Sequence, residues 1–277
     1  MKIRLQLLKV FLLCSLVLTG SLVKAETLNY SFGIVPQQSA DKLARLWGPI
    51  LRQIGEDTGL EVNFKTAPDI PTFEKRLAAG EYDFAYMNPY HYTVFNRTNG
   101  YQALAKAKDK RIKGILVVRK DSAIKQVADL VDGSTLAFPA PAAFAASILS
   151  QSNLNVSGVK YTPKYVSSHD SVYRTVAKGL YPAGGGIVRT LNNVAPEIRD
   201  QLRVLWTSQG YTPHAIAVHP RVRKNKALSL QQAFVRLDQQ AAGAILLNGI
   251  KIKGFEMARD SDWDDVRGLE LKELLNM

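Results

Sequence analysis

Apolar and polar positions recur along this chain with two periods, which predict helices and strands in turn. Between residues 41 and 58, apolar side chains recur at helical spacing and predict one amphipathic helix that ends at Gly59. Short apolar runs on either side of this segment predict strands. In this first unit we expect strands at 27–35, 61–66, 84–87, 102–106 and 113–119, and further helices at 71–79 and from Pro89 onward.

The same alternation continues after Arg119. We expect strands at 135–138, 159–166, 183–188, 202–206 and 215–218, and helices at 127–131, 141–149, 171–178, 228–247 and 269–274. Strands that alternate with helices predict an α/β fold whose sheets are mostly parallel. Ligands bind such sheets beyond the carboxyl ends of the strands.

Polar residues follow five of the predicted strands at that end. The candidates for ligand binding are Gln37, Gln38 and Ser39, then Tyr86, Asn88 and Tyr90, then Ala142 in the loop 139–144, then Ser168, His169 and Asp170, and finally Arg189. Tyr86 and Tyr90 differ in position along strand and helix, so we expect one of them to face the ligand. Five loops on the same side of two sheets predict a cleft.

The segment 80–92 is the most informative of these loops. Asn88 followed by Pro89 is typical of a helix N-cap and a first helical residue. Free backbone N–H groups at a helix start, with tyrosine and histidine donors around them, favour an anion. The alternative interpretation is a strand–helix turn with tyrosines in the core.

The first 25 residues have the pattern of a secretory signal peptide. Basic residues precede or flank an apolar run at 10–18 that is too short to span a membrane, and Val23 and Ala25 suit cleavage after Ala25. A lipid anchor at Cys14 is the competing hypothesis, and the bulky Leu13 before it disfavours that anchor. We therefore expect a periplasmic protein.

Charge and motifs exclude several classes of function. The net charge is +12, and the first 25 residues supply four positive charges and no negative one. The remaining basic residues are spread along the chain, so we expect no nucleic-acid partner, whereas a basic field helps to collect small anions. The motifs of zinc proteases, thiol redox proteins, serine hydrolases and phosphate-binding loops are absent. We expect no enzyme activity, no cofactor and no metal site.

Five motifs, in order, carry a resemblance to a known family. They are F-G-I-V-P-Q-Q-S, G-E-Y-D-F-A-Y-M-N-P-Y, F-P-A-P-A-A-F-A-A-S, S-S-H-D-S-V-Y and G-G-G-I-V-R-T. With these motifs the chain resembles the periplasmic substrate-binding components of phosphate, phosphite and phosphonate ABC transporters. The resemblance implies a two-lobed, type II-like fold that closes on its ligand by hinge bending.

The resemblance also implies how the chain divides between the lobes. The expected first lobe is discontinuous and spans 26–118 and 214–277, and the second spans 119–213. The hinge strands would lie near 116–119 and 215–218.

One loop departs from the family pattern. Phosphonate-binding members usually carry a serine- and threonine-rich cradle at the first long helix of the second lobe, whereas the loop 138–144 here has no hydroxyl. Backbone N–H groups remain from Ala142 onward. Arg189 is the expected compensating donor, because a guanidinium holds an oxyanion through two hydrogen bonds.

These observations predict the solute-binding component of an ABC importer that captures a phosphonate, phosphite or phosphate between its lobes. The expected partners are a membrane permease and its ATPase, and the expected state is a monomer. Three alternatives stay open at this point: a sensor that acts on a membrane kinase, a binder of another anion such as a sulfonate, and a secreted hydrolase.

Overall fold

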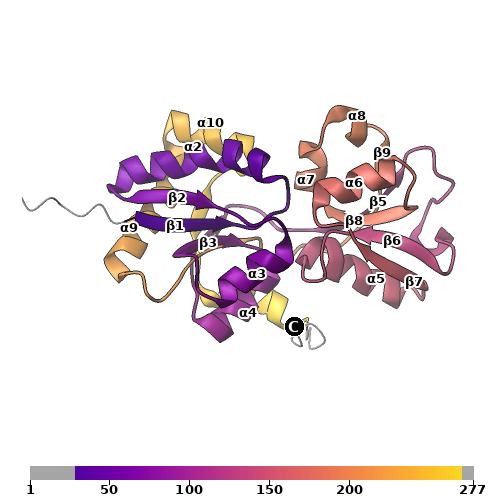
Figure 1. Cartoon of the computed structure of the whole chain (residues 1–277), viewed down its shortest axis with the longest axis horizontal. Coiled ribbons are helices and arrows are strands. Elements are labelled where there is room, and N and C mark those ends of the chain that lie inside the picture. Colours follow the sequence, from indigo (N-terminus) through magenta and orange to yellow (C-terminus); the bar gives the residue numbers. More distant parts are fainter. Residues whose placement is uncertain (1–28, 270–277) are drawn as a thin grey trace, which may run out of the picture.

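The computed structural model of the chain describes residues 29–269. These residues form two lobes, and each lobe is built on its own sheet (Figure 1). The expected signal peptide, the start of the first expected strand and nearly all of the expected helix at 269–274 lie outside the described residues.

The first lobe is built on a six-stranded sheet with the order β11-β4-β10-β3-β1-β2. Its first segment contains β1 (Asn29–Ile34), α2 (Ala40–Thr58), β2 (Glu61–Lys65), α3 (Ile70–Ala78), β3 (Phe84–Met87), α4 (Pro89–Asn99) and β4 (Gln102–Ala107). Its second segment contains β10 (Ala215–Val218), α9 (Lys224–Arg236), η3 (Leu237–Gln239), α10 (Ala241–Gly249), β11 (Phe255–Met257), η4 (Asp260–Trp263) and α11 (Asp264–Arg267). The predicted apolar face of α2 is buried, and Trp47 on it packs on Tyr86 of β3 with ring centroids 4.6 Å apart.

The second lobe is built on a five-stranded sheet with the order β7-β6-β8-β5-β9. Its elements are β5 (Gly114–Arg119), η1 (Val127–Asp129), β6 (Ser134–Phe138), η2 (Phe144–Leu149), α5 (Ser150–Val156), β7 (Tyr161–Tyr165), α6 (His169–Ala177), β8 (Ala183–Ile187), α7 (Val188–Asn193), α8 (Pro196–Arg199) and β9 (Leu202–Thr207).

The two-lobed α/β class is confirmed, but the sheets are mixed rather than mostly parallel. β1 pairs in parallel with β2 and β3, whereas β10 pairs antiparallel with β3 and β4. In the second sheet, β6 pairs in parallel with β7 and β8, and β5 pairs antiparallel with β8 and β9. The antiparallel strands β5 and β10 directly follow the two crossings of the chain between the lobes. The alternation of strands and helices in the sequence does not predict the direction of these two strands.

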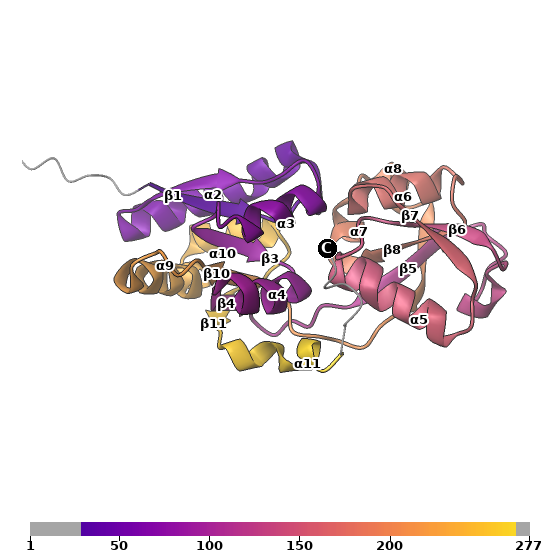
Figure 2. The same ribbon diagram turned by 60° about the horizontal axis from the view of Figure 1, so that its bottom comes forward.

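The first crossing between the lobes lies before the expected boundary at 118, whereas the return crossing ends at the expected boundary at 214. β5 belongs wholly to the second sheet, because it pairs with β8 and β9, so the first crossing lies at 108–113. The return crossing lies at 208–214. Figure 2 shows the two crossings running between the lobes. Ile112 and Tyr211 form an antiparallel bridge between them, with N–H···O distances of 2.8 and 2.9 Å. The expected hinge strands at 116–119 and 215–218 lie inside the sheets, and this pair of crossings is the link between the lobes.

Two expected helices differ from the prediction. The segment 228–247 is broken at Gln240, whose backbone is extended, and α10 folds back so closely that a Cβ on Gly243 would collide with the Leu237 carbonyl. The helix expected at 141–149 begins at Phe144, and its first six residues are π-helical before α5 continues it.

The three glycines of β8 are explained by close packing. A Cβ on Gly185 would overlap the carbonyl oxygen of Ala146 in η2, and a Cβ on Gly186 would overlap the hydroxyl of Tyr173 in α6. Side chains at these positions would push both helices off the sheet. The glycine run therefore sets how closely η2 and α6 pack on the sheet of the second lobe.

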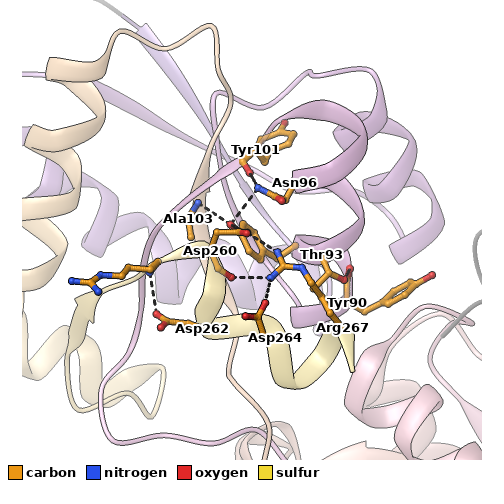
Figure 3. Close-up of polar contacts among 11 residues, drawn as sticks. Tyr90, Thr93, Asn96, Tyr101, Ala103, Asp260, Asp262, Asp264 and Arg267 are labelled. Atoms are coloured by element: carbon orange, nitrogen blue, oxygen red, sulfur yellow. Dashed lines mark hydrogen bonds and ion pairs between the residues drawn. The ribbon is translucent and has the colours of Figure 1, made fainter. Parts of the chain in front are cut away.

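The last described residues brace α4, the helix that Asn88 caps and that carries Tyr90. The Tyr92 hydroxyl donates a hydrogen bond of 2.7 Å to Asp260, and Arg267 binds the side chains of Asp260 and Asp264 (Figure 3). Tyr90, on the same helix, points away from this network.

Candidate functional site

The polar loops at the strand ends meet across the boundary between the lobes. The backbone N–H of His169 donates to the carbonyl of Gln37 at 3.2 Å, and Nη2 of Arg189 donates to Oε1 of Gln37 at 2.5 Å. Gln37 belongs to the first lobe, and the two donors belong to the second. The structure thus brings together loops that are more than 130 residues apart in the sequence.

Asn88 joins the lobes at a second point. Its Oδ1 accepts the N–H of His91 at 2.8 Å, which makes it the predicted N-cap of α4. Its Nδ2 donates at 3.0 Å to the carbonyl oxygen of Ala142 in the second lobe. The side chain is 3% exposed, so both hydrogen bonds are shielded from water.

An interlobe cavity lies between these two contacts. Its accessible volume is about 10 Å³, close to the room that one water molecule needs. Its lining is Val35, Gln37, Ile70, Asn88 and His214 from the first lobe with its return crossing, Ile112 from the outward crossing, and Ala143, Phe144, Ala145, Ala146, His169 and Ile187 from the second lobe. None of these side chains is acidic.

The start of η2 supplies backbone donors to this cavity. Its first helical hydrogen bond runs from Ser147 N to Ala143 O, so within the described chain the N–H groups of Phe144, Ala145 and Ala146 have no backbone acceptor. η2 runs directly into α5, and the two segments together place a positive helix end at the cavity. The proline- and alanine-rich loop therefore offers main-chain donors where side-chain hydroxyls are missing.

Two buried histidines face the cavity. Nδ1 of His169 lies 3.0 Å from the Thr190 hydroxyl, and burial, with Arg189 nearby, lowers the pKa of His169 to about 3. The ring of His214 stacks on Tyr86 at 4.9 Å, and its Nε2 has no hydrogen-bond partner among residues 29–269. Burial, followed by the charge of Arg189, also lowers the pKa of His214. Both rings are neutral near pH 7, and an anion beside them would favour their protonation.

Arg189 lies at the rim of the interlobe cavity and is absent from its lining. It lies on α7, directly after β8, where we expected a loop. Its guanidinium carbon is 5.8 Å from the centre of the Tyr86 ring. Burial raises the pKa of the Tyr86 hydroxyl, and Arg189 partly opposes that shift.

The remaining candidates have separate surroundings. Ser39 and Ser168 are N-caps, because their hydroxyls accept the N–H groups of Lys42 and Ser171 at 3.4 and 3.1 Å. Among the described residues, Nε2 of Gln38 has no hydrogen-bond partner. A ligand role for these three residues stays a prediction.

Asp170 and Tyr90 also differ from the residues around the cavity. Burial raises the pKa of Asp170, whose Oδ1 has no partner within 29–269. Tyr90 lines a separate groove between α3 and α4, together with Glu74 and Ala142. Neither tyrosine lines the interlobe cavity, and Tyr86 lies beside it through its stacking on His214.

Sequence reasoning missed three polar residues near the cavity. They are His214 on the return crossing, Thr190 beside the ring of His169, and His91, which is 1% exposed with its Nε2 2.8 Å from Glu74. The position of His214 directly after Pro213, at the return crossing, was the available signal.

Residues 32–263 match the family described as the periplasmic substrate-binding protein of phosphonate ABC transporters. The chain belongs to this family. It is 24% identical over 268 residues to the phosphate-import protein PhnD of Mycolicibacterium smegmatis, with 84% of this chain and 82% of the relative covered.

Two solved structures share the fold. One is a binding protein component of an ABC phosphonate transporter from Pseudomonas aeruginosa, with a TM-score of 0.80, 18% identity and coverage of 89% of this chain and 87% of that one. The other is a protein from Prochlorococcus marinus in complex with methylphosphonate, with a TM-score of 0.79, 17% identity and coverage of 88% and 97%.

Family membership confirms several expectations. The protein is the substrate-binding component of an ABC transporter and not an enzyme, and its family is periplasmic. Among residues 29–269, no helix is long and apolar enough to cross a membrane, and no three histidine, cysteine or acidic side chains group as metal ligands do.

Proposed function

We propose that this protein captures a small oxyanion of the phosphonate, phosphite or phosphate class in its interlobe cavity and delivers it to a membrane permease driven by an ATPase. The observation that carries the proposal is the set of buried donors around the interlobe cavity, whose lining has no acidic side chain. Fixed N–H dipoles and shielded hydrogen bonds favour an anion over any neutral ligand.

The relatives support the same ligand class. One curated relative is a phosphate-import protein, and one structural neighbour is bound to methylphosphonate. The cavity has an accessible volume of about 10 Å³ in this structure, so the lobes must move apart to admit even a small oxyanion.

The mode of binding follows from the connection between the lobes. Two chain crossings, paired at Ile112 and Tyr211, allow a hinge motion with little change inside either sheet. Closure brings Asn88 to Ala142 and Gln37 to Arg189, so the ligand would be enclosed by groups from both lobes.

The expected path of the protein completes the proposal. A signal peptide at 1–25 would deliver the chain to the periplasm, where it would act as a monomer that docks on the permease. Cleavage after Ala25 would leave a chain without cysteine, because Cys14 is the only one in the sequence.

Thermal shift and isothermal titration with a ligand panel test the proposal. The panel contains phosphate, phosphite, methylphosphonate, 2-aminoethylphosphonate, sulfate and taurine. A ligand at a hundred times its Kd adds about 2.7 kcal/mol of apparent stability, which is readily measured. Stabilisation by at least one phosphorus oxyanion is expected, and stabilisation only by sulfate or taurine would replace the ligand class with sulfur oxyanions.

A further inference from the structure

A second pocket adjoins the interlobe cavity on the side of the crossings. We call it the hinge pocket. Its accessible volume is about 150 Å³, and its lining includes Tyr86, Lys110, Arg111, Lys113, Arg189 and His214. Four of these residues are cationic and none is acidic. Ile112, Ile187 and His214 line both spaces, so the two are neighbours across shared walls.

The four cations are not equivalent. The guanidinium of Arg111 is already paired with Asp265 at 2.5 Å, and Lys113 is exposed to solvent. Lys110 and Arg189 are half-buried, and neither forms an ion pair with any described acidic residue. Lys110 donates only to the carbonyl of Lys251, and Arg189 only to Gln37.

The surroundings disfavour the charge on Lys110. Burial, followed by the repulsion of Arg189, lowers its pKa to about 8. Two partly buried like charges without an acid are unfavourable unless a negative group lies between them. Nε2 of His214, on the same wall, is a buried polar atom without a hydrogen-bond partner within the described chain.

We propose that the ligand carries a second acidic group that occupies the hinge pocket, so that the preferred substrates are phosphonocarboxylates, with the phosphonate in the interlobe cavity and the carboxylate beside Lys110 and Arg189. The inference rests on the proposed function of the interlobe cavity and names its substrate class. An aminoalkylphosphonate would place its ammonium group against two cations, and a simple alkylphosphonate would leave both cations unpaired.

Titration calorimetry with matched ligands tests the inference. Phosphonoacetate and 3-phosphonopropionate are compared with their carboxamides, which have nearly the same size without the charge, and with methylphosphonate and 2-aminoethylphosphonate. At least one phosphonocarboxylate should bind ten- to a hundredfold more tightly than its carboxamide, because a hydrogen bond between charged groups is worth about that factor. This comparison needs only the wild-type protein.

A charge variant locates the effect. Lys110→Gln should reduce the preference for the carboxylate over the carboxamide by about tenfold, whereas Lys224→Gln makes the same change of net charge on exposed α9 and should leave the preference intact.

The outcomes separate the two proposals. If methylphosphonate binds but no phosphonocarboxylate exceeds its carboxamide, or if Lys110→Gln keeps the full preference, the hinge pocket is not a carboxylate site while the proposed function stands. If no phosphorus oxyanion binds at all, the proposed function fails and this inference fails with it.

Discussion

The side-chain amide of Asn88 donates a hydrogen bond of 3.0 Å to the carbonyl oxygen of Ala142 in the opposite lobe, while its Oδ1 caps α4. One side chain therefore fixes a helix start at the cavity and also holds the second lobe against it. The two roles use different atoms, so substitutions can separate them.

Asn88→Ser and Asn88→Ala are expected to behave differently. Serine keeps a capping oxygen and loses the amide that reaches Ala142, whereas alanine loses both and costs about 1 kcal/mol of stability from the cap alone. Both variants should bind methylphosphonate or phosphate more weakly, and only Asn88→Ala should melt clearly earlier without ligand. Calorimetry and thermal melts measure the two effects. Full affinity in both variants would make Asn88 a structural cap only.

Arg189 links the lobes through Gln37 and supplies charge beside both spaces. Arg189→Ala should lower the affinity for a phosphorus oxyanion by about ten- to a hundredfold, the usual loss for a hydrogen bond between charged groups. Arg189→Lys keeps the charge without the planar fork and should fall between alanine and wild type. Stability without ligand should hold, because a partly buried cation without an acidic partner has been removed.

The control for Arg189 is Arg174→Ala in the same lobe. Arg174 is exposed on α6 and lines neither the interlobe cavity nor the hinge pocket. Its removal should leave the affinity unchanged. Equal losses of affinity in both variants would mean that the ligand responds only to the net positive charge of the protein. Wild-type affinity in Arg189→Ala would remove this residue from the site.

The predictable part of the fold is the part encoded by local periodicity. The strands at 84–87 and 215–218 agree with the structure to the residue, because they are continuous apolar runs that are wholly buried. The prediction for α2 differs by one residue, because its apolar spacing matches its one buried face. The loops that meet at the cleft could also be predicted, since they follow strand ends. The two-lobed arrangement was predicted from the family resemblance and not from the periodicity.

The missing parts depend on contacts between distant segments. The π-helical start at Phe144 depends on Gly185 of β8, which admits the Ala146 carbonyl. The hinge depends on a bridge between Ile112 and Tyr211, and no local pattern marks either residue. The role of His214 required knowing that the return crossing runs beside the cavity.

Closure about the crossings at 108–113 and 208–214 should be visible in solution. Small-angle scattering with saturating phosphate or methylphosphonate is expected to give a smaller radius of gyration than the ligand-free protein, because a hinge motion narrows the gap between two lobes. A radius that stays the same with a ligand shown by calorimetry to be bound would indicate a rigid module.

The mature chain should begin at Glu26. Val23 and Ala25 suit signal-peptide cleavage, and mass spectrometry of protein purified from the periplasm measures the terminus directly. An acylated Cys14 would instead establish a lipid anchor. The substitution Ala25→Arg supplies the control, because a bulky charged residue at this position should prevent cleavage of the signal peptide.

Acid should destabilise the ligand-free protein through its buried histidines. His169 has a pKa of about 3 in the fold against about 6.5 when exposed, and that of His214 is shifted in the same direction. Below pH 6.5 the unfolded chain takes up protons that the folded chain does not, so stability is fully present above that pH and falls as the pH drops toward 3. Each histidine contributes a slope of at most about 1.4 kcal/mol per pH unit.

Denaturant unfolding of His169→Gln between pH 7 and pH 4 measures this contribution. The variant should lose the slope of one histidine, whereas His219→Gln, which removes a more exposed imidazole, should keep most of the wild-type slope. A bound oxyanion should flatten the slope further, because a negative charge beside His169 and His214 raises their pKa values and lets the folded state accept the proton. An equal slope in wild type and His169→Gln would show that His169 is protonated in the folded protein without penalty.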